Sequence, residues 1–258
     1  MNEQDSTTQG RLLLVGVGPG DPELMTYRAV QAMADAPVWI GPKARENGTS
    51  SALAIASSKV APQGHEVLEL RFPMQKVNLG ENVPQEVENA WRSAAAKVLA
   101  RIDQGQDVAF PTLGDPGVYS TGFYLLATLQ EQRPTLKVEI IPGITAMSAC
   151  SAQLAQPLAL GDDVLAVVPA AFDDDRLRRI LAEHDVIVLM KVYRRLPVLV
   201  SLLQEMGLLE NALLIERAGF ADQRIYTNLV EVQDQPLHYF STLLLRKRRV
   251  QLRSCHDV

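Results

Sequence analysis

The chain has 258 residues, of which 47% are apolar and 21% charged, and it carries a net charge of −5. This balance is typical of a folded globular protein that forms one large domain or two modest ones. It argues against a general nucleic-acid binder, which would carry a basic footprint. No apolar run approaches the roughly 20 residues that span a bilayer, and the two cysteines are too few for a disulfide framework. We therefore expect a reduced, cytoplasmic protein that binds neither nucleic acid nor a membrane.

Strand-like and helix-like segments alternate through the first half of the chain. Short apolar runs predict strands at Leu12–Val15, Val38–Ile40, Val67–Leu70 and Val108–Phe110. A helix is expected at Pro22–Ala34, and apolar residues at helical spacing predict another from Val87 to Ile102. Alternation of this kind predicts a mostly parallel sheet with helices packed on it.

The second half of the chain predicts a second set of strands. They are expected at Val138–Ile141, Leu165–Val168, Ile187–Met190, Ala212–Glu216 and Phe240–Leu245. Helices are expected at Thr145–Leu154, Asp173–Ala182 and Leu196–Met206, the last of them ending at Gly207, where a C-cap glycine belongs.

About five strands in each half suit two domains better than one continuous sheet. We therefore predict two α/β domains, each with a roughly five-stranded sheet flanked by helices, and an active-site cleft between them. No long linker marks the boundary, which we place near residue 120. The expected division is a disordered segment 1–10, which is polar and lacks a signal core, an N-terminal domain 11–120, a C-terminal domain 121–249 and a tail 250–258.

A basic run, Arg246–Arg249, follows the last predicted strand. Such runs are usually solvated, so we interpret this one as an exposed C-terminal end. A weak contact with nucleic acid is the alternative interpretation.

Three glycine-containing loops follow three of the predicted strands. They are Gly16–Thr26, Thr112–Thr121 and Pro142–Ala146. Glycine lets backbone approach a ligand closely, and open α/β sheets place their ligands at strand ends. The three loops therefore indicate an enzyme with a cleft built from strand ends.

The first loop fits a dinucleotide-binding fingerprint poorly. Its glycines stand at positions 16, 18 and 20, and Gly41-Pro42 occupies the place of the expected ribose-binding carboxylate. Asp21 would also repel a pyrophosphate. A P-loop motif is missing from the sequence. An NAD-dependent dehydrogenase therefore stays a minor alternative.

Together the three loops resemble those of the tetrapyrrole methylases, and the resemblance extends from Arg11 to Arg249. Within that family, four stretches resemble the branch that methylates C20 of corrin precursors: Leu70–Met74, Thr112–Thr121, Val188–Val192 and Glu216–Gly219. The resemblance implies a homodimeric enzyme of cobalamin biosynthesis. It would transfer a methyl group from S-adenosylmethionine (SAM) to precorrin-2 or to cobalt-factor II.

The resemblance also implies which residues contact SAM, which has no phosphates and carries a sulfonium cation. The candidates carried over by motif are Pro19, Leu113, Gly114, Asp115, Val118, Thr145, Ala146, Met190 and Gly219. A plainer interpretation stays open for several of them, because Pro19 and Gly114 can shape turns and Met190 can fill the core.

A corrin precursor is a large, flat macrocycle with eight carboxylates, so its site needs an apolar floor and a basic rim. Basic candidates near the expected cleft are Lys43, Arg45, Arg71, Lys76, Lys191, Arg194 and Arg195. Of these, Arg71, Lys191 and Arg194 are our predicted substrate contacts. Tyr193 is a candidate for the floor or for packing at a domain edge.

Methyl transfer to an electron-rich carbon needs alignment of the reactants, and no enzyme nucleophile is required. The sequence offers no convincing nucleophile–base pair, and its four histidines show no metal-ligand spacing, so we expect no protein-bound metal. A base that takes up the C20 proton could be Asp21, Glu23, Tyr119 or water; we select Asp21 and Tyr119. Asp21 is equally suited to cap the following helix.

Other functions fit the same pattern. A sibling enzyme that methylates another ring position would use the same fold and loops. A non-catalytic protein that binds SAM or tetrapyrrole would also use them, since fold alone does not determine function. The acidic composition argues against relatives that act on RNA.

Overall fold

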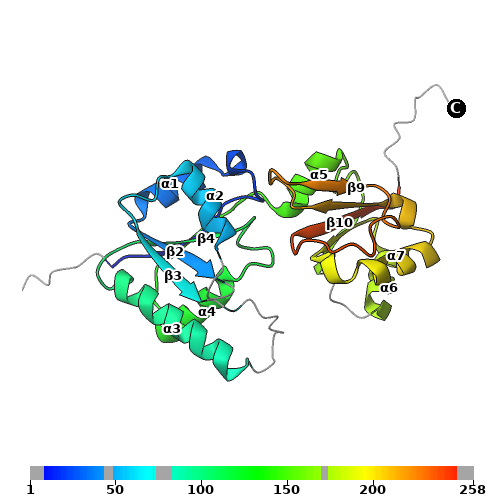
Figure 1. Ribbon diagram of the computed structural model, residues 1–258. Coiled ribbons are helices and arrows are strands. Elements are labelled where there is room, and N and C mark those ends of the chain that lie inside the picture. The colour runs from blue at the N-terminus through cyan, green and yellow to red at the C-terminus, as the bar shows by residue number, and fades with distance from the viewer. Residues whose placement is uncertain (1–8, 44–48, 72, 74–82, 170–173, 249–258) are drawn as a thin grey trace, which may run out of the picture. The chain divides into compact units, whose positions relative to one another are not determined.

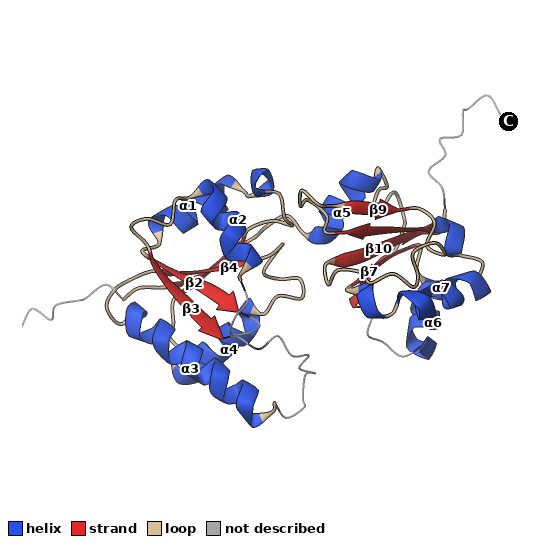
Figure 2. Ribbon diagram, viewed as in Figure 1, coloured by secondary structure: helices blue, strands red, loops and turns tan. Residues whose placement is uncertain are grey.

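The computed structural model describes residues 9–43, 49–71, 73, 83–169 and 174–248. The chain divides into two units, residues 1–145 and 146–258. Within the described residues, each unit is built on its own five-stranded sheet with flanking helices (Figures 1 and 2). This confirms the predicted pair of α/β domains.

The first unit contains a parallel sheet with the strand order β3-β2-β4-β1-β5. Its strands are β1 (Leu12–Gly16), β2 (Val38–Lys43), β3 (Glu66–Arg71), β4 (Val108–Thr112) and β5 (Val138–Ile141). Its α-helices are α1 (Tyr27–Asp35), α2 (Ser51–Lys59), α3 (Gln85–Ile102) and α4 (Gly122–Gln132). Helices α1 and α2 cover one face of the sheet, and α3 and α4 cover the other (Figure 1). Since both faces are covered, the central strands are continuous apolar runs.

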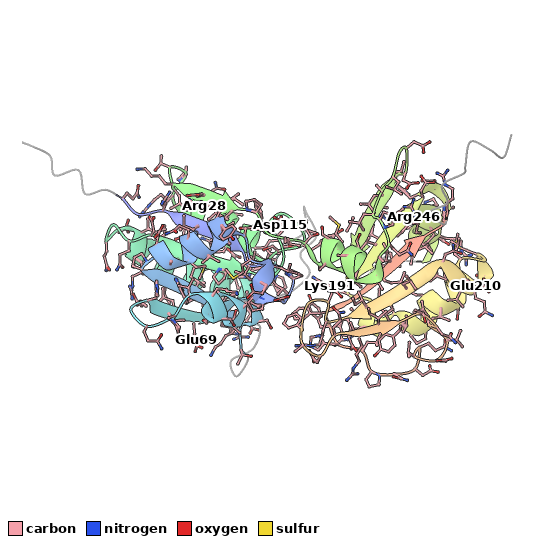
Figure 3. The ribbon with its side chains drawn as sticks, turned by 90° about the horizontal axis from the view of Figure 1, so that it is seen from above. Arg28, Glu69, Asp115, Lys191, Glu210 and Arg246 are labelled. Carbon is pink, nitrogen blue, oxygen red and sulfur yellow. The ribbon has the colours of Figure 1, made fainter. Side chains whose placement is uncertain are left out.

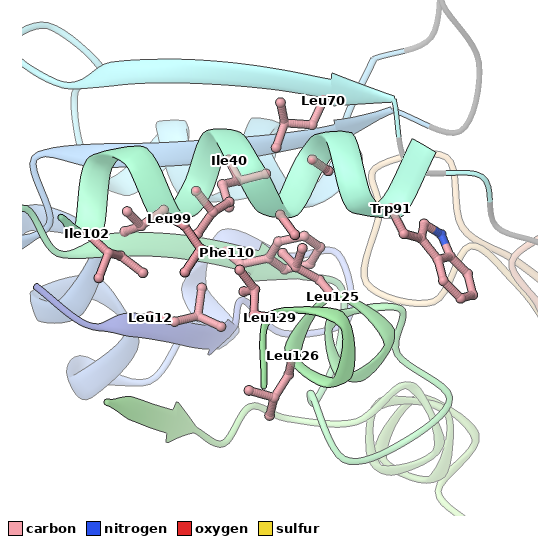
Figure 4. Close-up of a cluster of buried hydrophobic side chains, with 14 of the residues drawn as sticks. Leu12, Ile40, Leu70, Trp91, Leu99, Ile102, Phe110, Leu125, Leu126 and Leu129 are labelled. Atoms are coloured by element: carbon pink, nitrogen blue, oxygen red, sulfur yellow. The ribbon is translucent and has the colours of Figure 1, made fainter. Parts of the chain in front are cut away.

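The core of this unit lies between the sheet and the helices α3 and α4 (Figure 4). The apolar face of α3 packs on Leu12 and Phe110, which are 0% and 1% exposed. Near the start of α3, the Trp91 ring stacks on Tyr124 of α4 with centroids 5.2 Å apart. The helical spacing seen in the sequence is therefore the buried face of α3.

Strands β1 and β4 are neighbours, but their connections leave in opposite directions. β1 leads through α1 to β2, which lies beyond β4, whereas β4 leads through α4 to β5, which lies beyond β1. In open α/β sheets the ligand crevice forms outside the carboxyl ends of such a strand pair. This topology places the predicted loops Gly16–Thr26 and Thr112–Thr121 side by side.

The second unit contains a mixed sheet with the strand order β6-β7-β10-β8-β9. Its strands are β6 (Leu165–Pro169), β7 (Val186–Met190), β8 (Ala212–Glu216), β9 (Arg224–Tyr226) and β10 (Ser241–Arg246). Strands β6 and β7 are parallel, and the remaining neighbours are antiparallel. The α-helices α6 (Asp174–Glu183) and α7 (Leu196–Glu205) pack on one face, and α5 (Ala146–Leu154) packs on the other. Short 3₁₀ helices lie at Val192–Arg194 and Leu209–Asn211.

The division between the units differs from the predicted boundary near residue 120. Strand β5 pairs in parallel with β1, so α4 and β5 belong to the first sheet and the unit ends at Thr145. Gly10 was predicted to belong to the disordered segment, but it is buried and its N–H donates to Ile102 O at 3.1 Å. Residues 1–8 and the predicted tail 250–258 lie outside the described residues.

The helix predicted at Pro22–Ala34 is two helices. A 3₁₀ helix spans Pro22–Leu24, and α1 begins at Tyr27. Thr26 separates them, because its Oγ1 accepts a hydrogen bond from Ala29 N at 3.1 Å and so caps α1. Helix α2 and the short strand β9 are further elements that the sequence pattern did not indicate.

The described part of the basic run, Arg246–Arg248, is not the solvated end that we predicted, because each of its residues has a partner. Arg246 is 8% exposed, and its Nη2 donates to the buried Asp163 carboxylate at 2.6 Å. Arg248 pairs with Asp185 at 2.8 Å, and Lys247 Nζ donates to Ala182 O at 2.7 Å. Arg246 and Arg248 therefore join the end of β10 to the segments that precede β6 and β7.

We expect Arg246→Ala to lower the melting temperature by several degrees, because it leaves the Asp163 carboxylate buried without its main partner. The Arg246 guanidinium holds the pKa of that carboxyl below its usual range. Arg248→Ala is the matched control, since Arg248 is 62% exposed and its loss should matter much less. Thermal unfolding followed by circular dichroism measures both; equal decreases would contradict a special role for the buried pair.

Candidate active site

The loops after β1 and β4 are joined by backbone hydrogen bonds. Val17 N donates to Thr112 O at 3.0 Å, and Gly18 and Gly114 exchange hydrogen bonds of 3.3 and 2.6 Å in an isolated antiparallel bridge. Gly18 and Gly114 both have a positive φ, 80° and 74°. A residue with a Cβ is strained in that region, so this bridge favours glycine at both positions.

Three glycines of the first unit pack backbone against backbone, one from each loop. A Cβ added to Gly16 would lie 2.6 Å from Gly143 N and 2.8 Å from Gly114 O. A Cβ added to Gly143 would overlap the same carbonyl oxygen. The sequence predicted that these glycines let the backbone approach a ligand. In the structure they allow the backbones of the three loops to touch each other. We call this contact of Gly16, Gly114 and Gly143 the glycine cluster.

The Asp115 carboxylate connects two of these loops. Its Oδ1 accepts a hydrogen bond from Gly117 N at 2.7 Å, and its Oδ2 accepts one from Gly143 N at 2.9 Å (Figure 3 labels Asp115). Hydrogen bonds from backbone N–H to an ionised carboxylate are stronger than neutral ones. Asp115 therefore holds the loop after β4 against the loop after β5, a structural role that comes in addition to the predicted contact with cofactor.

The loop after β4 is closed by a pair of hydroxyl groups. Thr112 Oγ1 and Ser120 Oγ are 2.9 Å apart, and Gly122 N donates to Ser120 Oγ at 3.0 Å. Tyr119, which directly precedes Ser120, has a φ of 51°, a value that a non-glycine residue rarely adopts. Such backbone strain concentrates at functional sites. Burial raises the pKa of Tyr119, so its phenol stays protonated near neutral pH and is a poor base.

The side chain of Asp21 caps a helix. Its Oδ1 accepts a hydrogen bond from Glu23 N at 2.9 Å, and Asp21 is the N-cap of the 3₁₀ helix Pro22–Leu24. Glu23 forms an ion pair with Lys59 of α2. The capping interpretation of Asp21 is thus confirmed, and both carboxylates have partners within the first unit.

The predicted cofactor residues fall into two groups. Pro19, Leu113, Gly114, Asp115 and Val118 lie on the adjoining loops after β1 and β4. Thr145 lies in the loop after β5 and is the last residue of the first unit. The other group lies in the second unit, where Ala146 begins α5, Met190 ends β7 and Gly219 follows β8 by three residues.

Some of the predicted basic residues form ion pairs with acidic residues, and others do not. Arg71, at the end of β3, pairs with Glu86 of α3 at 2.7 Å, and Lys43 pairs with Glu69 at 2.5 Å. Lys191 and Arg194 form no ion pair with any residue that the structure describes. Arg45 and Lys76 lie outside the described residues.

A network of side chains holds the Glu216–Gly219 stretch at the end of β8. The Glu216 carboxylate is 4% exposed and accepts hydrogen bonds from His238 N and, at 3.2 Å, from the Tyr226 hydroxyl. Arg217 contacts His238 Nε2 through Nη1 at 3.2 Å and donates to Asp222 at 2.6 Å. Its backbone φ is 52°, a second strained residue at a strand end. Apart from the four-residue motif Glu216–Gly219, no pattern in the sequence indicated this network.

His238 is held in its neutral form. Burial, reinforced by the Arg217 guanidinium, lowers its pKa, although Glu216 and Asp222 act in the opposite direction. Phe240 N donates to His238 Nδ1 at 3.0 Å, a hydrogen bond that requires an unprotonated nitrogen.

We therefore expect protonation of His238 to lower the free energy of unfolding as the pH falls. The unfolded chain takes up this proton near pH 6.5, whereas the folded chain takes it up only at lower pH. His238→Asn keeps an acceptor for Phe240 N–H and should flatten the melting temperature against pH between about 6.5 and 5. An unchanged slope in the variant would show that other groups cause the loss.

The fold defines a two-unit α/β protein with a glycine-packed loop cluster at a topological switch point. The chain belongs to the tetrapyrrole (corrin/porphyrin) methylases, whose family model matches residues 11–233. This confirms the resemblance seen in the sequence. The family is SAM-dependent, so the chain is a methyltransferase.

Two relatives are 35% identical to the chain. One is the cobalt-precorrin-2 C(20)-methyltransferase of Salmonella typhimurium, aligned over 93% of this chain and 97% of the relative. The other is the precorrin-2 C(20)-methyltransferase of a Sinorhizobium species, aligned over 92% and 95%.

Solved structures show the same fold. A cobalt precorrin-4 methyltransferase superposes with a TM-score of 0.71 at 20% identity and covers 95% of this chain and 98% of its own. The uroporphyrin-III C-methyltransferase of Thermus thermophilus, complexed with S-adenosylhomocysteine, gives a TM-score of 0.62 at 23% identity over 91% and 97%.

Two further properties concern the described residues alone. None of their helices is both long and apolar enough to cross a bilayer. They also contain no group of three or more His, Cys, Asp or Glu residues placed to hold a metal ion.

Proposed function

We propose that this protein methylates C20 of precorrin-2 or cobalt-factor II in cobalamin biosynthesis, with SAM as the methyl donor. The observation that carries the proposal is the similarity to two C(20)-methyltransferases over nearly their whole length. One of them is named for a cobalt-containing substrate and the other for a metal-free one, at the same identity. The choice between the two substrates is therefore left to experiment.

We infer that the loops of the first unit hold SAM. The glycine cluster leaves these loops without side chains at their point of contact, so a ligand at this place would meet small residues and backbone. This suits a cosubstrate without phosphates. The N–H and C=O of Gly114 are already bonded to Gly18, and we propose Leu113 and Gly114 as contacts by their position on the loop. Pro19, Asp115, Val118, Thr145, Ala146, Met190 and Gly219 complete the proposed set. When bound, SAM supplies a methyl group on a sulfonium sulfur.

Lys191 and Arg194 are the proposed contacts for the substrate carboxylates. Both lack an acidic partner among the described residues, so their charges are available to an anionic ligand. Arg71 is a weaker member of the proposed set, because Glu86 already pairs with it.

The proposed contribution of the chain to catalysis is positioning. Holding two reactants in line accounts for about 7–11 kcal/mol of a barrier in favourable cases. Asp115 and the Thr112–Ser120 pair fix the loops before any ligand arrives, which is what such positioning requires. Asp21 already caps a helix and Tyr119 has a raised pKa, so water is the better candidate for the group that takes up the C20 proton.

The family resemblance supports two further parts of the proposal, a homodimeric state and a cytoplasmic location. The molar mass of the purified protein, measured by light scattering, checks the first part. A monomer across the working concentration range would contradict it.

Mass spectrometry tests the proposed function. The protein is incubated anaerobically in two parallel reactions, one with SAM and precorrin-2 and the other with SAM and cobalt-factor II. Gain of one methyl group on one of the two supports the proposal and identifies the substrate. Gain on neither, while S-adenosylhomocysteine still binds, would reject it in favour of a sibling enzyme or a non-catalytic binding protein.

A further inference from the structure

Three segments of the second unit meet at one end of its sheet. β7 and β8 end there and β10 begins there, because Met190 pairs with Thr242 and Glu216 pairs with Ser241. The segment after β7 carries Tyr193, and the segment before β10 carries Tyr239 and Phe240. Figure 3 labels Lys191 at this end and Arg246 at the opposite end of the sheet.

Four aromatic rings form a continuous cluster at this end. The ring of Tyr193 lies edge-on to Tyr239 with centroids 5.5 Å apart, and Tyr239 lies edge-on to Phe240 at the same distance. Phe240 in turn stacks on Phe220 at 5.9 Å. We call these four rings the aromatic cluster. Tyr239 is 37% exposed and the other three are partly buried, so the cluster reaches the surface.

Two cations lie on the rings of this cluster. Lys191 Nζ is 5.3 Å from the centroid of Tyr239, and Arg194 Cζ is 5.1 Å from that of Tyr193. Both distances are within the range of a cation–π contact. Neither cation has an ion pair with a described residue, whereas Arg217, which lies on Phe220, is neutralised by Asp222.

The backbone of Lys191 is strained. Its φ and ψ are 63° and 42°, in the left-handed region, and its N–H is fixed by a 2.8 Å hydrogen bond to Ser241 O. A glycine would adopt this conformation freely. Strained residues of this kind concentrate at functional sites, which makes Lys191 a candidate for a functional role.

We propose that the aromatic cluster is the surface on which the flat face of the tetrapyrrole lies, with Lys191 and Arg194 binding its carboxylates. The inference rests on the proposed function and adds Phe220, Tyr239 and Phe240 to its site. A conjugated ring stacks on aromatic side chains, and its acidic side chains pair with the cations that lie over two of these rings. The surface thus selects for a ligand that is both flat and anionic.

Binding of uroporphyrin III, a flat tetrapyrrole octacarboxylate, tests this surface. Its affinity is measured from the change in porphyrin absorbance, for the wild type and for Tyr239→Leu and Tyr193→Leu. We expect each variant to weaken binding roughly tenfold and to keep the affinity for S-adenosylhomocysteine. Tyr27→Leu is the matched control, since Tyr27 is a 97% exposed tyrosine of the first unit.

Lys191→Gly separates a functional lysine from a structural one. The change removes the ammonium group and relieves the left-handed strain, so we expect weaker uroporphyrin binding without a lower melting temperature. A structural lysine would give the opposite pattern, a lower melting temperature and unchanged binding.

The outcomes distinguish this proposal from the proposed function. If the wild type methylates its substrate and both tyrosine variants match its kcat/KM and its uroporphyrin affinity, the aromatic cluster is not the binding surface and the proposed function stands. A loss as large in Tyr27→Leu would overturn the surface in the same way. If the wild type neither binds uroporphyrin nor methylates either precursor, both proposals fail.

Discussion

Gly143→Ala is expected to abolish the binding of S-adenosylhomocysteine while leaving the two sheets folded. The new Cβ would overlap Gly114 O and lie 2.8 Å from Gly16 Cα, and neither is the end of a flexible side chain. The loops after β1, β4 and β5 must therefore separate. Because most of the proposed cofactor contacts lie on these loops, binding should be lost. Isothermal titration calorimetry measures the binding, and circular dichroism checks the fold.

Gly64→Ala is the control for this variant. Gly64 lies in the same unit and has a φ of 96°, but no atom lies within 4 Å of its added Cβ. Its substitution should therefore lower stability by about 1 kcal/mol through backbone strain alone and leave binding intact. Wild-type affinity in Gly143→Ala would show that the cofactor binds elsewhere.

Asp115→Ala should weaken S-adenosylhomocysteine binding by roughly 100-fold. The change removes two hydrogen bonds between a carboxylate and backbone N–H groups, each of which contributes about 1.5 kcal/mol, and frees the loop after β4 from Gly143. Asp115→Asn is the graded partner of this variant. The amide oxygen can accept a hydrogen bond from one of the two backbone N–H groups, whereas the amide NH₂ would face the other N–H donor. We therefore expect the affinity to fall about tenfold.

Two other results would argue against this role of Asp115. Equal losses in the alanine and asparagine variants would indicate that charge near the ligand matters more than the two hydrogen bonds. Unchanged affinity in both would mean that the loops keep their arrangement without the carboxylate. The melting temperature, recorded for each variant, separates a local effect from general unfolding.

The sequence predicted much of the fold because local signals and packing agree. The apolar spacing along Val87–Ile102 became the buried face of α3, and the buried apolar runs became the strands. The unit boundary was missed because β5 joins the first sheet by pairing with β1. This pairing is a long-range contact, and the four residues of β5 do not indicate it. The basic run was misjudged for a similar reason, since the partner of Arg246 lies 83 residues earlier in the chain.

The candidate site divides in the same way. Glycine spacing predicted which loops come close, but not that Gly16, Gly114 and Gly143 touch each other or that Asp115 holds two loops together. The aromatic cluster was missed, apart from Tyr193, because its rings come from three separate segments that only the antiparallel pairing of β7, β8 and β10 brings together.

The central claim, methyl transfer to C20, is tested most directly by locating the transferred carbon. SAM labelled with ¹³C in its methyl group is incubated with the substrate identified by mass spectrometry, and the product is examined by carbon NMR. We predict one enriched methyl signal, coupled to the C20 meso carbon. An enriched methyl group on any other ring carbon would contradict the claim and assign the protein to a sibling reaction.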